Sequence, residues 1–382
     1  MKTLTRGNIK RTLGLLVCLV LIYTLRTVWT GHSKYRRLKS QTSGFNSPLL
    51  GSLTSNTSKT KITSQNQGRS VHVHYYGRPE SVSLQAFARC DHKCHMTDGN
   101  TIDENADAVI MHGPYMTKDW KVPPKPPGQI WVYQAMEPPI GVEGSLQKWR
   151  GMFNWTMTHR RDSDIYSPYG SFMKIPKGHD VKISPTNWES KDRQAAWFVS
   201  HCATPGKREL YEKELRKYVD VHIYGGCGSY RCPRSKENSC LKELADHYKY
   251  YLAFENSFCD DYVTEKPFKM FWNELHTIPV LRGLSDKYKL FFPPGSYLNT
   301  YDFPTIQKLG EEMISISKNR TRFASFFNWR KYYMTEEIDL YYCDLCKRLH
   351  YPDKNRRVYH NLEEWVIGHP DKRACQTPGD IL

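Results

Sequence analysis

The residues best suited to bind an anionic ligand lie in one segment, Tyr248–Lys266, which reads YKYYLAFENSFCDDYVTEK. The apolar run Tyr250–Phe254 is typical of a buried strand, and the polar residues Glu255–Asp261 follow it as a loop. A helical pattern then begins at Thr264. Backbone N–H groups and the helix dipole attract anions at such a helix start, and Lys266 adds a full positive charge. The segment therefore predicts a phosphate-binding pocket, such as a nucleotide donor needs, at the carboxyl end of a strand.

Strands and helices alternate around this segment, which is typical of parallel βαβ units. In chain order we expect a strand at Ala195–Ser200, a helix at Gly206–Tyr218, a strand at Val219–Tyr224, a helix at Cys240–His247, the strand at Tyr250–Phe254, a helix at Glu265–Leu275 and a strand at Thr277–Leu281.

The preceding part of the chain has strand patterns at Val71–Tyr76, Ala108–Met111 and Ile130–Ala135, but its helices are harder to place. We expect a second α/β domain there, facing the first across a cleft. The end of the chain, from residue 353, carries a helix pattern at His360–Ile367, and we expect it to pack back on this N-terminal domain.

The N-terminus predicts a membrane anchor. Basic residues precede the apolar run Leu13–Leu25, which is shorter than the roughly 20 residues of a standard span. Residues 12–30 could cross a thin bilayer if Arg26 reaches the interface. A cleaved signal peptide is the alternative, but no clear small-x-small cleavage site is present, which favours an uncleaved anchor. Residues 31–70 are rich in Ser, Thr, Lys, Gln and Gly, and we interpret them as a flexible stem.

The net charge of +16 fits nucleic-acid binding, attraction to acidic surfaces or phosphorylated ligands, or simple solubility. Because the basic residues are spread along the chain instead of forming one stripe, nucleic-acid binding is disfavoured. The hydrophobic content of 39% excludes a disordered chain.

Ten of the 11 cysteines lie beyond the apolar run, which suits disulfides in an oxidising lumen. Cys343-x-x-Cys346 could instead be a redox pair or half of a zinc site, with Cys90-x-x-x-Cys94 as the other half. In a secretory chain we favour disulfides that join these two pairs. Glycosylation sequons at Asn56, Asn154 and Asn319 also fit a lumenal chain.

Several motifs follow one another in the order found in the α1,3-fucosyltransferases of glycosyltransferase family 10, which the chain resembles over residues 71–350. They are YKYYLAFENSFCDDYVTEK with NELHTIPVLRG (Asn273–Gly283), PPKPPGQIWVYQAMEPP (Pro123–Pro139), FNWTMTHRRDSDIYSPYG (Phe153–Gly170), SYLNTYDFPTIQKL from Ser296, FNWRKYY (Phe327–Tyr333) and CDLCKRLH (Cys343–His350). The resemblance implies a GT-B fold, in which two Rossmann-like domains face a central cleft. It also implies inverting transfer of L-fucose from GDP-fucose to a sugar hydroxyl.

With this resemblance we expect a single-pass type II protein of the Golgi membrane whose catalytic part is lumenal. The expected parts are a cytoplasmic tail (1–11), a transmembrane signal-anchor (12–30), a stem (31–70), an acceptor-binding domain (71–188), a GDP-fucose-binding domain (189–352) and a C-terminal tail (353–382).

A sugar hydroxyl is a poor nucleophile, so inverting transfer needs a general base beside it. By resemblance that base is Glu137. The alternative is that Glu137 is an ordinary surface residue before a turn. The family usually has Ser-Pro after this glutamate, whereas this chain has Pro138-Pro139, and the departure bears on the acceptor loop.

The departing diphosphate needs positive charge. By resemblance Lys266 and Arg208 supply it, although solvated helix charges are the common role of such residues. Before Arg208 the family commonly has Ser-Asn, and this chain has Ser200-His201-Cys202, so the loop here departs from the pattern.

Four further residues match donor-contacting positions or lie beside them. Glu265 would accept hydrogen bonds from the ribose hydroxyls. Asn256 and Tyr262 match donor contacts, with loop capping and core packing as their respective alternatives. Glu255 either holds the loop or approaches the fucose.

Asp162 and Asp164 form an Asp-x-Asp pattern that metal-dependent transferases use. Two arginines directly precede the pattern, so we interpret it as structural, paired in internal salt bridges. In GT-B enzymes protein cations typically replace the metal, so we expect no metal site and no required cofactor, with Mn²⁺ or Mg²⁺ stimulatory at most.

The expected partners are GDP-fucose, a GlcNAc-containing glycan of a glycoprotein or glycolipid, and the membrane.

The alternative function is that of a catalytically inactive, membrane-anchored carbohydrate-binding protein, although pure binding would not require an acid–base group beside a phosphate site. A sulfotransferase should show a Gly-rich strand–loop–helix for its phosphosulfate donor, and we find none in the sequence.

Overall fold

The structure is a computed structural model that describes residues 69–116, 119–140, 142, 144–176, 186–283, 285–336 and 340–381. The expected cytoplasmic tail, the membrane anchor, nearly all of the stem and the sequon at Asn56 lie outside these ranges. Every helix within them is too short or too polar to span a bilayer.

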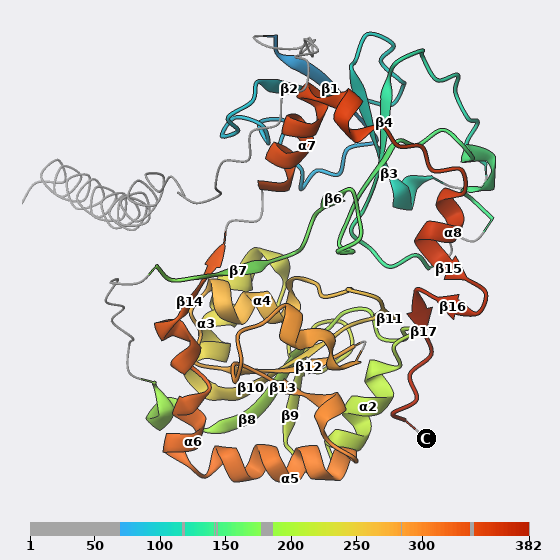
Figure 1. The fold of residues 1–382 in the computed structure, drawn as a ribbon. Helices are drawn as coiled ribbons and strands as arrows, with labels where there is room; N and C mark the ends of the chain where they lie inside the picture. Colours follow the sequence, from blue (N-terminus) through green and yellow to red (C-terminus); the bar gives the residue numbers. More distant parts are fainter. Residues whose placement is uncertain are drawn as a thin grey trace, which may run out of the picture. The chain divides into compact units, whose positions relative to one another are not determined.

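The described residues contain two parallel sheets (Figure 1). The first sheet has the order β2-β1-β3-β4-β5-β6. Its strands are β1 (Val71–Tyr76), β2 (Cys94–Gly99), β3 (Ala108–His112), β4 (Ile130–Ala135), β5 (Trp155–Thr158) and β6 (Ile165–Tyr166).

The second sheet has the order β13-β12-β10-β8-β9. Its strands are β8 (Arg193–Phe198), β9 (Val221–Tyr224), β10 (Tyr248–Phe254), β12 (Ile278–Arg282) and β13 (Leu298–Asn299). In both sheets the first strand in the chain is an inner strand. The second strand pairs with one side of it, and the later strands are added in sequence on the other side. This is the flavodoxin-like variant of the doubly wound fold, whose ligands bind where the strand order reverses. In the second sheet that point lies between β8 and β10.

Side chains of the second sheet alternate between two buried cores. Tyr250, Leu252 and Phe254 of β10 face one core, and Tyr251 and Ala253 face the other. Because both faces of a parallel sheet are covered, its strands are apolar throughout.

Helices of this half of the chain cover both faces of the second sheet. The first core contains side chains of α2 (Arg208–Leu215), α5 (Ile306–Ser317) and α6 (Arg320–Ser325), and the second contains those of α3 (Glu237–His247) and α4 (Glu265–Trp272). The helices and strands expected here are present, with ends shifted by a few residues. Thr305 caps α5 by accepting a hydrogen bond from the Lys308 backbone N–H.

The first sheet is covered by helices from the end of the chain. Side chains of α7 (Leu340–His350) complete the core on one face, and α8 (Leu362–Ile367) contributes to the core on the other. Figure 1 shows α7 beside β1 and β2. Helix α7 therefore corrects one expectation, because it lies in the range assigned to the second domain but packs on the first sheet.

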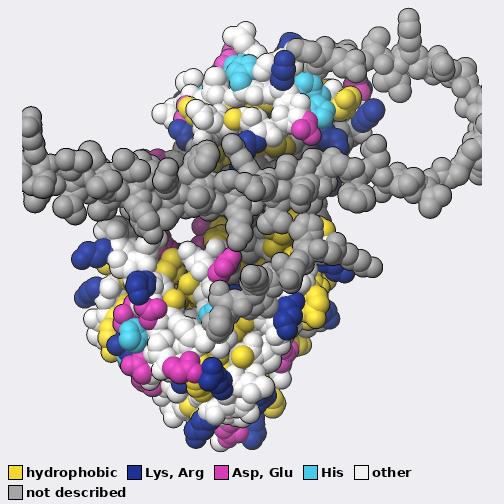
Figure 2. Space-filling view, turned by 90° about the vertical axis from the view of Figure 1, so that its left-hand side faces the viewer, with side chains coloured by type: hydrophobic (Ala, Val, Ile, Leu, Met, Phe, Trp, Pro, Cys, Tyr) yellow, Lys and Arg dark blue, Asp and Glu magenta, His cyan; other side chains and the backbone are white. Residues whose placement is uncertain are grey.

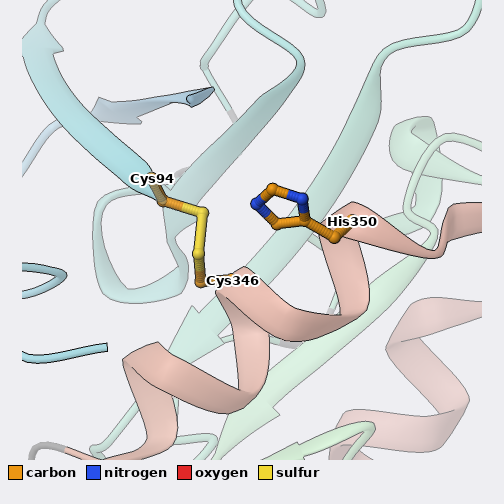
Figure 3. A group of neighbouring side chains, drawn as sticks. All are labelled: Cys94, Cys346 and His350. Carbon is orange, nitrogen blue, oxygen red and sulfur yellow. A yellow bond between two sulfur atoms is a disulfide. The ribbon is translucent and has the colours of Figure 1, made fainter. Parts of the chain in front are cut away.

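Disulfides fix α7 on the first sheet. Cys90 pairs with Cys343, and Cys94 pairs with Cys346, so the two close cysteine pairs cross-bridge each other. Figure 3 shows the second bridge with His350 next to it. Because the sulfur atoms of Cys94 and Cys346 are bonded to each other, these residues are not free to bind zinc, the alternative raised in the sequence analysis. The ring of His350 contacts the backbone oxygen of Lys93 at 3.1 Å.

The end of the chain continues beyond the first sheet. The short strand β17 (Cys375–Gln376) pairs antiparallel with β11 (Phe258–Cys259), and a disulfide joins Cys375 to Cys259. Asp380 forms a bidentate ion pair with Arg282 at the end of β12. The tail therefore packs partly on the first sheet, as expected, but ends on the second.

The remaining short strands pair antiparallel outside the two sheets. They are β7 (Ser171–Lys174) with β14 (Tyr333–Glu336), and β15 (Gly368–His369) with β16 (Lys372–Arg373). On the face shown in Figure 2, basic side chains lie among acidic ones and do not form one stripe.

The two described sequons differ in their surroundings. Asn319 is exposed and caps α6 through the backbone N–H of Arg322. Asn154 is half-buried: its side-chain oxygen accepts a hydrogen bond from the Trp131 N–H, and its amide donates to the Arg357 carbonyl. Both ends of this amide hold the fold together, and glycan attachment at Asn154 and Asn319 stays a prediction.

Candidate active site

Arg208 ties together the carboxyl ends of β8 and β10. Its guanidinium donates hydrogen bonds to the backbone oxygens of Phe254, at 2.9 Å, and His201, at 3.1 Å. Burial lowers the pKa of this group, which nearby carboxylates partly offset. Among the described residues no carboxylate lies within ion-pair distance of Arg208, so no direct ion pair neutralises its charge at the switch point.

Gly206 allows the loop before α2 to lie against the loop after β10. A Cβ atom at Gly206 would lie 2.9 Å from the backbone oxygen of Asn256 and 3.0 Å from that of Glu255. The Gly206 N–H donates to the same Asn256 oxygen at 2.7 Å. A larger residue would separate the two loops that surround Arg208.

Glu255 is the central buried acid of this site, with 1% of its surface exposed. Its carboxylate accepts hydrogen bonds from the backbone N–H of Thr264 at 2.8 Å and the Thr264 hydroxyl at 2.9 Å. Lys266 forms an ion pair with it at 2.9 Å. Of the two roles considered for Glu255, these contacts favour holding the loop.

The anion site predicted at the start of α4 is therefore occupied by the protein's own carboxylate. Burial lowers the pKa of Lys266, but Glu255 and Glu265 outweigh burial and raise it, so Lys266 is charged. An ammonium group has three donors. Glu255 and the Thr264 hydroxyl take two of them, and no other described residue is a partner for the third.

The other expected donor-site residues lie around this pair. Glu265 is half-buried in the first turn of α4. The side-chain oxygen of Asn256 is sealed from solvent and has no hydrogen-bond partner among the described residues, and the hydroxyl of Ser257 is in the same state. Buried polar groups normally have partners, so the local packing has to change for a ligand to reach these atoms.

Arg282 is a site residue that the sequence reasoning missed. Its side chain is fully buried, and it donates to the Gly206 backbone oxygen at 2.6 Å and to the carboxylate of Asp380. It therefore holds the loop before α2 in place through the Gly206 backbone oxygen. The sequence signal that could have identified Arg282 is its position at the end of a predicted strand, directly before Gly283.

Glu137 follows β4 and faces a cavity of about 290 Å³. The cavity is lined by residues that follow β3, β4 and β5, by Cys259 and Asp260 from the loop after β10, and by residues of the C-terminal tail. Glu137 is exposed, so its carboxylate is accessible from this cavity.

Tyr262 connects the loop after β10 to Glu137. Its hydroxyl donates a hydrogen bond to Glu137 Oε2 at 3.2 Å. The Tyr262 side chain is only 3% exposed, and burial, together with the Glu255 and Glu137 carboxylates, raises its pKa, so it remains a neutral donor. Asp261, one residue earlier, adopts a left-handed backbone conformation with φ of 55° and accepts the backbone N–H of Arg161.

His159 is a second residue that the sequence reasoning missed. It lines the Glu137 cavity, and its ring packs edge-to-face against Tyr262 with 5.1 Å between the centroids. It stands directly before the two arginines that drew attention to the Asp-x-Asp pattern.

The Asp-x-Asp residues serve the fold. Asp162 pairs with Arg160, and Asp164 accepts hydrogen bonds from Thr156, Arg357 and Tyr359. These contacts match the structural interpretation of the pattern.

Comparisons with known proteins show which family the sequence matches. The sequence model for "Glycosyltransferase family 10 (fucosyltransferase) C-term" matches residues 188–365, and that for "Fucosyltransferase, N-terminal" matches residues 68–170. Alpha-(1,3)-fucosyltransferase C of Drosophila melanogaster is 34% identical over 300 residues, which cover 72% of this chain and 69% of the relative. Alpha-(1,3)-fucosyltransferase 7 of Rattus norvegicus is 32% identical over 283 residues, 71% of each chain.

A crystal structure of an α1,3-fucosyltransferase with GDP-fucose is similar with a TM-score of 0.47 and 16% identity, covering 73% of this chain and 86% of that chain.

The Glu255–Lys266 pair generates a prediction about stability. Glu255→Ala should lower the free energy of unfolding by about 3 kcal/mol, because the half-buried Lys266 and the Thr264 N–H would lose the buried carboxylate that they contact. Urea denaturation measures the loss. The exposed pair Glu214–Lys217 on α2 gives a matched control, since Glu214→Ala should change stability little. Equal losses in the two variants would contradict the role of Glu255.

His159 generates a prediction about pH. Burial, with a smaller effect from Arg160, lowers its pKa to about 4. An unfolded histidine has a pKa of about 6.5, so between about pH 6.5 and 4 the unfolded chain takes up a proton that the folded chain does not. Stability should therefore decrease as the pH is lowered from about 6.5 to about 4, and His159→Gln should reduce this loss. An unchanged slope in denaturation experiments would mean that the pKa of His159 is the same in the folded and the unfolded chain.

Proposed function

Because this chain belongs to glycosyltransferase family 10, the fucosyltransferases, we propose that it transfers L-fucose from GDP-β-L-fucose to a GlcNAc hydroxyl of glycoprotein or glycolipid glycans, with inversion. Family membership makes it a glycosyltransferase enzyme of the α1,3-fucosyltransferase group. The donor, the acceptor and the residue roles given below are the proposal.

The hydrogen bond between Tyr262 and Glu137 carries the proposal. It brings the segment between β10 and α4, whose ends contact Arg208 and Lys266, within contact of a carboxylate that follows a strand of the first sheet. A glycosyl transfer needs this juxtaposition, because the base must lie on one side of the anomeric carbon and the leaving group on the other.

In the proposed reaction Glu137 removes the proton of the acceptor hydroxyl. The oxygen then forms a bond to the anomeric carbon of fucose while the bond from that carbon to the β-phosphate oxygen breaks. GDP leaves with the bonding electron pair, and the β-linkage of the donor becomes an α-linkage in the product. Tyr262, as a neutral donor, holds the Glu137 carboxylate in place before the acceptor binds.

Arg208 and Lys266 stabilise the charge that develops on GDP. Arg208 lies at the switch point without an ion-pair partner among the described residues, and Lys266 keeps one free N–H donor. Glu265, half-buried at the start of α4, would accept hydrogen bonds from the ribose. Charged donors fixed in advance stabilise a leaving diphosphate without reorganising during the reaction.

The proposal includes a GT-B arrangement and a lumenal location in the Golgi as a type II membrane protein. Five disulfides among the described residues support an oxidising compartment. No metal is required in this scheme, because the protein's own cations act on the leaving group, and Mn²⁺ or Mg²⁺ would be stimulatory at most.

A donor screen tests the proposed function. Secreted protein of residues 65–382 would be incubated with several sugar nucleotides and GlcNAc-containing glycans, and the products analysed by mass spectrometry. We expect only GDP-fucose to give a product, and the added mass should be that of one deoxyhexose. Transfer from a different sugar nucleotide, or no binding of GDP-fucose in calorimetry, would refute the proposal.

The base assignment has its own test. Glu137→Gln should lower kcat by at least about 100-fold, the usual contribution of a general base, and leave GDP affinity nearly unchanged. Tyr262→Phe, which removes only the hydroxyl that contacts Glu137, should lower kcat less. Kinetics and calorimetry with GDP measure both effects. Loss of GDP affinity in Glu137→Gln would show that Glu137 serves the donor site instead.

A further inference from the structure

The end of the chain forms part of the wall of the candidate active site. We call residues 362–380 the C-terminal strap. At its beginning, the buried carboxylate of Glu363 accepts hydrogen bonds from the backbone N–H groups of Gly144 and Leu146, at 2.9 and 3.0 Å. Arg160, beside the first sheet, donates to the backbone oxygen of Trp365 and stacks on its ring at 4.2 Å. These contacts fix α8 on the rim of the first sheet.

The far end of the strap is fixed to the loop after β10. The Cys259–Cys375 disulfide joins the two, and the Asp260 N–H donates to the Ala374 carbonyl at 2.7 Å. The ion pair of Asp380 with the fully buried Arg282 holds the last residues. The strap is therefore held at both sides of the Glu137 cavity.

Between these attachments the strap forms part of the cavity wall. Trp365, Val366 and Ala374 line the same cavity as Glu137. Trp365 is half-buried, and the other two side chains are nearly fully buried. Pockets for drug-sized ligands span about 300–1,000 Å³, so a cavity of about 290 Å³ has room for a sugar ring beside the base.

We propose that the strap selects the acceptor, with Trp365 contacting the sugar that Glu137 deprotonates and the Cys259–Cys375 bridge setting the position of this wall. The ligand class is one N-acetylhexosamine ring, whose C–H faces suit an indole surface, and the wall limits substituents next to the reacting hydroxyl. This inference rests on the proposed function.

A purely structural strap would behave differently from a wall. Weakening a structural strap would lower stability and would reduce activity on all acceptors by the same factor. Weakening a wall changes the ratio of activities on two acceptors, and it leaves the KM for the donor unchanged. The ratio is therefore the decisive quantity.

The first experiment compares Trp365→Ala with the wild type on two acceptors. One is a simple β-GlcNAc glycoside, and the other carries a galactose on the hydroxyl next to the reacting one. Removing the indole should shift the ratio of kcat/KM toward the bulkier acceptor by about tenfold, the scale of a changed pocket contact. Trp365→Phe should keep a ratio close to the wild type. Trp188→Ala removes another half-buried indole, outside the cavity lining, and should leave the ratio unchanged.

The second experiment tests the disulfide. The double variant Cys259→Ser/Cys375→Ser should raise the acceptor KM and shift the ratio in the same direction as Trp365→Ala. Cys232→Ser/Cys240→Ser removes a bridge whose cysteines lie outside that lining and should leave the ratio unchanged. Thermal denaturation identifies variants that fail to fold.

Binding without turnover separates this inference from the proposed function. The two acceptors would be titrated by calorimetry into Glu137→Gln saturated with GDP, with and without Trp365→Ala. A shifted ratio of acceptor Kd values supports the wall even if the wild type transfers no fucose. Equal ratios with and without the indole, in kinetics or in binding, would overturn the proposal.

Discussion

The buried carboxylate of Glu255 is the contact on which the candidate site depends. It accepts the first backbone N–H before α4 and neutralises Lys266, so it fixes both the start of the helix and the direction of the lysine. A buried ion pair of this kind contributes little net stability, but losing one partner is costly. Its value here is positional: the loop between β10 and α4 is held in the shape that carries Tyr262 to Glu137.

The same loop is fixed from its other side by buried arginines. Arg208 bridges the ends of β8 and β10, and Arg282 supports the Gly206 loop while Asp380 balances its charge. The planar guanidinium group suits this task because its fork of donors reaches several carbonyl oxygens at once. Of these two arginines, only Arg208 has no ion-pair partner among the described residues, and it lies at the switch point of the second sheet, where doubly wound folds bind their ligands.

The end of the chain makes the first sheet and the site one unit. Helices α7 and α8 cover the two faces of the first sheet, and the strap continues to the loop after β10. Three disulfides that involve this part of the chain join residues more than a hundred positions apart. By restricting the unfolded chain, such long-range bridges help to hold a cavity whose walls come from distant segments.

Local patterns in the sequence determined the alternating elements of the second sheet, the strands of the first and the ordered family motifs, and the resemblance carried by those motifs proposes Glu137 and Lys266 as the reacting groups. The elements and motifs follow from the periodicity and the types of residues that are neighbours in the sequence. Only the tertiary structure decided that Glu255 fills the predicted anion site, that Tyr262 touches Glu137, that Asn154 is tied into the fold and that the tail lines the cavity. Each of these depends on which segments meet in space. That is set by the summed packing of the whole chain, so no short window of sequence contains it.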